Sequence, residues 1–161
     1  MKGIIDIEFI LSVVVFLSTI SFVAMLIINN IPVFHGDSVS EDLRARAYQI
    51  SQVLIFDKGA PEYWTVGNVL RVGLSNGTKQ TMNTTKIANL ASLCSSSYEN
   101  TKSLLGQDYR TDIKIKIIDA ANQTLLDCKP QVISLIRPEF QIIRFANLDD
   151  KRIVRIAVSV L

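Results

Sequence analysis

The chain has 161 residues and a mass of 17.9 kDa, enough for one ordinary domain with an appendage but not for two domains with full cores. Its 17 basic side chains against 15 acidic ones give a net charge of +2, which excludes a strongly basic nucleic-acid binder that works through bulk phosphate attraction. Seven glycines and four prolines exclude collagen-like and low-complexity chains.

An apolar segment dominates the N-terminal region. Residues 9–28 contain no charge, proline or glycine, and as a helix they span about 30 Å, the thickness of a bilayer's hydrocarbon core. The four hydroxyl side chains within it can bond to the helix's own carbonyls. A buried core helix is the alternative, but such helices rarely remain apolar on every face for twenty residues. We therefore expect a membrane helix and a single anchored domain.

The residues before this segment do not form an ordinary secretory signal peptide. One lysine, Lys2, precedes Gly3, and two acids, Asp6 and Glu8, stand just before the apolar run. A secretory signal has several positive residues and a small-residue cleavage site, and neither is present. One interpretation is an uncleaved signal anchor whose two acids lie at the level of the lipid headgroups.

This flank also resembles the class III signal peptide of archaeal type IV pilins and pilin-like proteins. In that family a short leader ends in Lys-Gly or Arg-Gly, and a prepilin peptidase cleaves after the glycine. The resemblance implies a leader of residues 1–3, cleavage between Gly3 and Ile4, and Glu8 as the fifth mature residue. Ile4 and Asp6 stand where archaeal members often have glutamine and serine or threonine.

The resemblance also implies a role for Glu8. In the family's filaments this glutamate is thought to pair with the free amine of a neighbouring subunit. A carboxylate at the edge of hydrocarbon is costly unless it is paired, and a matched pair fixes the register between subunits. The apolar helix, residues 4–30, would lie in lipid before assembly and in the filament core afterwards.

The part after this helix reads as a linker or kink at 31–40 and then a head domain at 41–161. Pro32 and Gly36 lie in the linker, and a capping box begins at Ser38. Apolar side chains then recur at helical spacing up to about residue 56. These residues form one stripe, and they are Leu43, Ala47, Ile50 and Leu54.

Short elements are expected in the middle of the chain. The segment 57–61 stops the helix, and 69–74 is a strand candidate. Residues 86–94 and 98–105 read as two short helices, the first capped near Asn83 or Thr84. Similar spacing of Asp, Gly, Trp, Lys and Tyr residues between positions 57 and 106 occurs in many archaeal exported proteins with class III signal peptides. Trp64, just after the helix stop, is expected in the core.

From residue 111 onward the hydrophobic period changes to two, which is typical of half-buried strands. Strands are expected at 113–117, 124–128, 132–136, 140–146 and 152–161, with a turn at 148–151. The predicted fold class is α+β: a long hydrophobic N-terminal helix, then an amphipathic helix packed on a C-terminal antiparallel β-sheet.

Two cysteines allow one intrachain pair, Cys94 with Cys128, and a domain outside the membrane would keep such a disulfide. The bond would close a loop worth up to about 3.8 kcal/mol on the chain-entropy model. Two free buried thiols are the alternative. Three N-x-S/T sequons, at Asn76, Asn83 and Asn122, fall in predicted loops and make surface glycosylation plausible.

No pattern in the sequence points to catalysis. His35 is the only histidine, and it stands alone just beyond the apolar helix. There is no phosphate loop, nucleophile elbow or carboxylate cluster with metal spacing, and the pair Asp149 and Asp150 reads as a solvated turn. We expect no enzyme, no cofactor, no metal site and no nucleic-acid partner.

The expected function is that of a type IV pilin-like subunit at the cell surface, assembled through its N-terminal helix into a filament for adhesion or contact. Its partners would be copies of itself or other pilins, the prepilin peptidase and membrane lipid. The α+β head leaves open a minor pilin or a homologue that does not polymerise. The alternative function is a signal-anchored extracytoplasmic binding domain, which would tolerate Glu8→Ala.

Overall fold

The computed structural model describes residues 7–131 and 138–161, except for the side chains of residues 30–37. The chain divides into two compact units, one ending at Val39 and the other comprising Ser40–Leu161. Several predicted features lie outside the described residues: the leader 1–3, the cleavage residues Gly3 and Ile4, the strand at 132–136 and the side chain of His35.

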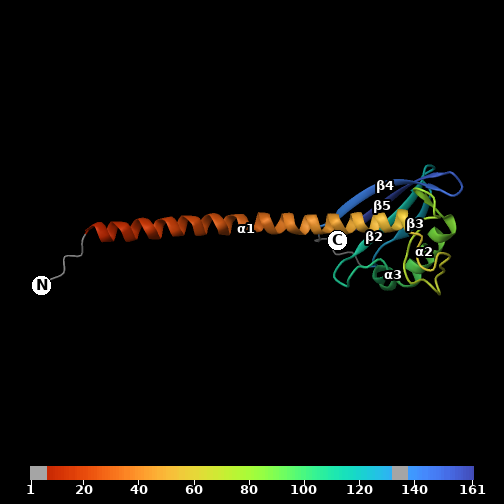
Figure 1. Ribbon diagram of the computed structural model, residues 1–161, viewed down its shortest axis with the longest axis horizontal. Coiled ribbons are helices and arrows are strands. Elements are labelled where there is room, and N and C mark those ends of the chain that lie inside the picture. The colour runs from red at the N-terminus through yellow and green to blue at the C-terminus, as the bar shows by residue number, and fades with distance from the viewer. Residues whose placement is uncertain (1–6, 132–137) are drawn as a thin grey trace. The chain divides into compact units, whose positions relative to one another are not determined.

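The first helix, α1, comprises Ile7–Phe56 (Figure 1). Its helical backbone includes residues 31–40, so the separate helix start predicted at Ser38 is not found. A proline inside a helix removes one hydrogen bond and often bends the helix without ending it, which lets a proline-containing segment stay helical. A kink at 31–40 stays a prediction. The predicted stop is confirmed, because α1 ends before Asp57.

The Ser40–Leu161 unit contains a five-stranded sheet, and its strands β2, β3, β4 and β5 are labelled in Figure 1. The strands lie in the order β1-β4-β5-β2-β3 in a curled, mostly antiparallel sheet. Their bounds are β1 Thr81–Met82, β2 Ile113–Asp119, β3 Thr124–Cys128, β4 Phe140–Leu148 and β5 Ile153–Val160. The α+β class is therefore confirmed.

The core lies between this sheet and the C-terminal half of α1. Alternate side chains of β2 and β5 are fully buried, as the period of two predicts. They pack in one cluster with the predicted apolar stripe of α1. The cluster includes Leu43, Ala47, Ile50, Leu54, Ile113, Ile115, Ile117, Val154, Ile156, Val158 and Val160. The packing of an amphipathic helix on the sheet is confirmed.

Two short helices complete the unit, α2 at Thr84–Ser96 and α3 at Tyr98–Leu104. The Asn83 side chain caps α2 by accepting a hydrogen bond from the Lys86 amide at 3.2 Å. Gly106 follows α3 with φ +72°, the left-handed conformation that favours glycine after a helix end. Both helices were predicted, and the cap lies at Asn83, one of its two predicted positions.

The prediction of a strand at 69–74 is wrong. Arg71 makes one isolated bridge, to Ala60, and Leu74 donates its amide to the Leu54 carbonyl of α1 at 3.1 Å. The backbone groups of this segment are therefore satisfied by the neighbouring loop and helix end rather than by a strand. Strand β1, which pairs in parallel with the last residues of β4, was not predicted.

Candidate functional site

The N-terminal unit carries a surface suited to lipid. Among the described residues, one helical segment is long and apolar enough to cross a membrane, Ile7–Asn29, with a mean hydropathy of 2.7 and no buried residue. Ser18 donates to the Val14 carbonyl at 2.7 Å and Thr19 to the Phe16 carbonyl at 2.8 Å. These hydroxyls are satisfied inside the helix, as predicted, so they do not oppose burial in hydrocarbon.

Glu8 lies in the first turn of α1 with an exposed side chain. Its neighbours Ile7 and Phe9 are also exposed, at 82% and 66%. The helix dipole favours a carboxylate in a first turn. In a hydrocarbon setting, however, that carboxylate needs a cationic partner.

The disulfide between Cys94 and Cys128 is present, as predicted. It joins α2 to the last residue of β3, with the two Cα atoms 5.7 Å apart. Disulfides persist in oxidising compartments, so the bond indicates an extracytoplasmic head domain. Together with the apolar helix, it supports a membrane-anchored protein.

Several residues of the sequence pattern between positions 57 and 106 stabilise the loop after α1. Trp64 is buried, as expected, and its Nε1 donates to the Gly73 carbonyl at 2.9 Å. The Lys86 ammonium is buried and donates to the carbonyls of Lys58 at 2.7 Å and Ser75 at 2.9 Å. Burial lowers the pKa of Lys86. These side chains stabilise the fold.

Tyr98 and Lys102, which belong to the same sequence pattern, also stabilise the fold. The Tyr98 hydroxyl donates to the Ile113 carbonyl at 3.0 Å and accepts from the Ile113 amide at 2.9 Å. Burial raises the pKa of Tyr98 to about 12, so the hydroxyl keeps its proton at neutral pH. Lys102 lies 5.7 Å from the Tyr98 ring centroid and pairs with Glu99 at 2.9 Å. This cluster fixes α3 against β2.

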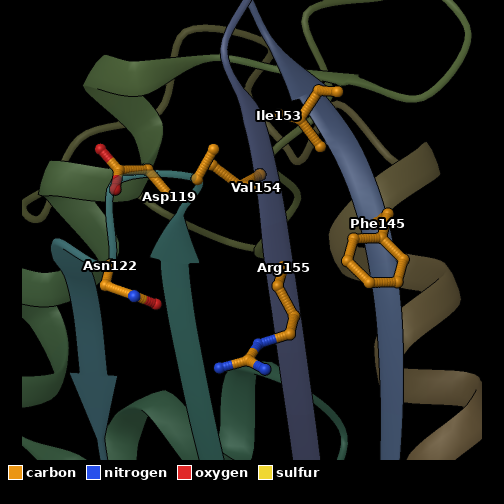
Figure 2. A pocket seen from close by; sticks show the side chains of 7 residues that line it. Asp119, Asn122, Phe145, Ile153, Val154 and Arg155 are labelled. Atoms are coloured by element: carbon orange, nitrogen blue, oxygen red, sulfur yellow. The ribbon is translucent and has the colours of Figure 1, made fainter.

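The sheet carries an exposed apolar surface on the face opposite the core, which we call the outer-face patch: Ile143, Phe145 and Ile153. These side chains are 51%, 65% and 56% exposed. Arg155 lies opposite Phe145 in the β4–β5 register. A hollow of about 220 Å³ lies between this patch and the β2–β3 turn, and Figure 2 shows residues that line it. Sequence reasoning did not find this surface, although Phe145 and Ile143 occupy the alternate positions of β4.

The three sequons differ in their surroundings. Asn76 is exposed, and its side-chain oxygen accepts from the Thr78 amide at 2.9 Å. Asn83 is half-buried and caps α2. Asn122 is exposed in the β2–β3 turn with φ +62°, and it lines the hollow across from Phe145.

The structure does not assemble the other polar candidates into one site. Asp150 pairs with Arg152 at 2.7 Å in the β4–β5 turn, and this hydrogen-bonded pair holds the pKa of Asp150 below its ordinary value. Asp149 accepts from the Thr84 amide at 3.3 Å. Within 7–131 and 138–161, no group of three His, Cys, Asp or Glu side chains could hold a metal ion.

The arrangement therefore offers two surfaces for binding, the apolar helix with Glu8 and the outer face of the sheet. Each is built from exposed apolar side chains with one nearby charge. Comparison with protein-family models, curated proteins and solved structures finds no match to this chain.

Proposed function

We propose that this protein is a type IV pilin-like structural subunit that is processed after Gly3 and assembles through its N-terminal helix into a cell-surface filament. The observation that carries the proposal is the position of Glu8. It lies five residues after Gly3, in the first turn of α1, directly before residues 9–28, which carry no charge. The described fold, an apolar N-terminal helix with further helices and a curled sheet, is compatible with a pilin-like subunit.

The apolar surface of α1 drives the proposed assembly. The exposed Val, Leu, Ile and Phe side chains of Ile7–Asn29 need an apolar environment on all sides. Lipid supplies it while the subunit is in the membrane, and neighbouring helices supply it in the filament. The exchange brings copies of the helix together without exposing this surface to water.

Glu8 sets the register in this mechanism. Cleavage after Gly3 creates a free amine on Ile4, and the Glu8 carboxylate of a neighbouring copy pairs with it. An unpaired carboxylate or amine surrounded by helices would cost several kcal/mol, on the order of the effective penalty for burying one ion. Only the axial offset that pairs the two charges avoids this cost, so one offset is selected.

The remaining parts of the proposal follow from this arrangement. The head would lie outside the cytoplasmic membrane, where its loops contact surfaces, and the subunit would act by binding rather than catalysis. Its partners would be copies of itself or other pilins, lipid before assembly, and the prepilin peptidase that removes residues 1–3.

The proposal is tested by comparing Glu8→Gln with a matched control, Glu41→Gln. Glu41 is also an exposed glutamate of α1, and it pairs only loosely with Arg44, at 3.6 Å. Each variant replaces the sole chromosomal copy in the source organism, and surface filaments are sheared off, pelleted and quantified against the protein left in the membrane.

We expect wild type and Glu41→Gln in the filament pellet and Glu8→Gln in the membrane fraction alone. Filaments in equal amounts from all three would contradict the register mechanism. Absence of this chain from wild-type filaments would favour the signal-anchored binding domain.

A further inference from the structure

The outer-face patch is exposed, whereas the apolar side chains on the opposite face of β2 and β5 are buried. Phe145 of β4 and Ile153 of β5 line one side of the hollow, across from the β2–β3 turn, and Arg155 lies between Phe145 and Ile118 of β2. Arg155 makes no ion pair with another residue in the described part of the chain, so its guanidinium donors remain available. An aromatic ring beside a free guanidinium suits a ligand with both C–H faces and hydroxyl groups.

A sequon lies at the rim of this hollow. Asn122, followed by Gln123 and Thr124, lines it from the β2–β3 turn. Within the described residues its side-chain amide makes no hydrogen bond, and the residue is exposed. Figure 2 shows the Asn122 amide and the Arg155 guanidinium extending toward each other over β2, on the side of the sheet that carries the Phe145 ring.

The other two sequons lack such a surface. The Asn83 side chain is half-buried and is used as the cap of α2. Asn76 is as open as Asn122, but its turn is bordered by Gly77 and the flexible Lys58 side chain rather than by an aromatic ring. Asn76 therefore provides a control that has the acceptor sequence without the apolar hollow.

We propose that Asn122 carries an N-linked glycan whose first sugar lies in the hollow and covers the outer-face patch. The volume of about 220 Å³ is that of several water molecules at about 30 Å³ each, on the scale of one sugar ring. The C–H face of that ring packs on Phe145 and Ile153, and its hydroxyls accept hydrogen bonds from Arg155. The glycan thus removes apolar surface from water.

The modification is an ordinary group transfer. The donor is a lipid-phosphate-linked oligosaccharide, and a membrane oligosaccharyltransferase catalyses the step outside the cytoplasm. The Asn122 side-chain nitrogen forms a bond to the anomeric carbon, and the bond from that carbon to the phosphate oxygen breaks. The lipid phosphate leaves with the electron pair, and the amide nitrogen loses one proton to a base of the enzyme.

Covering the patch has a consequence for the subunit's surface. Exposed apolar residues on a sheet face promote unspecific association. A bulky hydrophilic glycan anchored at Asn122 prevents it and leaves the rest of the head free. The inference rests on the extracytoplasmic position of the head in the proposed function, but not on filament assembly.

The first measurement is the fraction of molecules that carry a glycan at each sequon. The full chain is purified in detergent from its source membrane, digested, and each sequon peptide is analysed by mass spectrometry. We expect glycan on Asn122 in most molecules. Unmodified Asn122 overturns the proposal, whether or not Asn76 is modified. The N-terminal peptide in the same digest reports cleavage after Gly3, so failure of this inference and failure of the pilin-like function are read separately.

The proposed contact between the Asn122 glycan and Phe145 is tested by a double-mutant cycle on the glycosylated full chain. Phe145→Thr is made in the wild type, in Asn122→Gln and in Asn76→Gln, and Tm is measured for each in the same detergent. Phe145 is exposed, so the variant keeps the core intact. We expect Phe145→Thr to lower Tm by about 2–4 °C more in wild type than in Asn122→Gln.

The Asn76→Gln background should show the same effect as wild type, because Asn76 is not one of the residues that line the hollow. The unglycosylated chain exported to a bacterial periplasm should show no coupling between residues 122 and 145. Equal effects of Phe145→Thr in the glycosylated wild type and in Asn122→Gln would overturn the contact.

Discussion

Replacing Gly73 by alanine should destabilise the head although Gly73 is far from both proposed binding surfaces in the sequence. An added Cβ at this position would lie 2.4 Å from the Asp57 carbonyl oxygen and 2.4 Å from the Gly59 amide nitrogen. Both atoms belong to the backbone, so no side chain can rotate away to relieve the overlap. The loop after α1 must therefore move.

The magnitude follows from two contributions. Overpacking of this kind costs about 1–3 kcal/mol. Movement of the Gly73 carbonyl also breaks its hydrogen bond with the buried Trp64 Nε1, at 2.9 Å, worth about 1 kcal/mol. The sum of about 2–4 kcal/mol corresponds to a fall in Tm of about 4–16 °C for a chain of this size.

The assay is thermal unfolding of the full chain in detergent, followed by circular dichroism and by Trp64 fluorescence. Gly67→Ala is the matched control, because a Cβ there meets nothing within 4 Å. That control should unfold at the wild-type temperature or slightly above it, since alanine reduces the entropy of the unfolded chain. A Gly73→Ala protein as stable as Gly67→Ala would refute the packing argument.

Three other perturbations have defined outcomes. Replacing Cys94 and Cys128 together by serine should lower the free energy of unfolding by up to about 3.8 kcal/mol. In a denaturant titration, the wild type in reductant should unfold like the variant. A loss of less than about 1 kcal/mol would contradict the stabilising role of the disulfide. Asp119→Asn should cost about 1–3 kcal/mol in the same titration, because the buried carboxylate accepts from Arg152 at 3.0 Å and from two backbone amides; an unchanged midpoint would show that these bonds are not needed. Lys114 holds the pKa of Glu139 below its ordinary value near 4.3, so this stabilisation is complete above that value and is lost as pH falls through the folded-state pKa. Tm should therefore decrease as the pH is lowered below about 4.5, and Glu139→Gln should weaken this dependence. Identical profiles of Tm against pH for wild type and Glu139→Gln would contradict the assignment.

The elements with strong periodicity were predictable from the sequence. The alternation in β2 and β5 and the helical stripe that begins at Leu43 indicated which faces are buried, because each repeat has a unique match to strand or helix geometry. The cysteine pair was predictable because two cysteines allow one bond. Local patterns of this kind predict the structure correctly when the core buries the helix and strand faces that the patterns mark as apolar.

The remaining features depend on contacts between distant residues. Strand β1 has two residues and exists because it pairs with the end of β4, so no local period marks it. The segment 69–74 has strand-like composition, but its backbone bonds to Ala60 and to the end of α1. The placement of Asn122 and Phe145 around one hollow is set by the register of β2, β5 and β4, which a single sequence does not reveal.

The most direct test of the pilin-like account is the N-terminus of the protein in its native membrane. Intact mass and N-terminal sequencing of the purified full chain identify the first residue. The account predicts a chain that begins at Ile4, having lost the first three of its 161 residues, with an amine free to pair with Glu8 of a neighbour. A chain that still begins at Met1, in cells whose prepilin peptidase cleaves a control substrate, would contradict it and favour a signal-anchored binding domain.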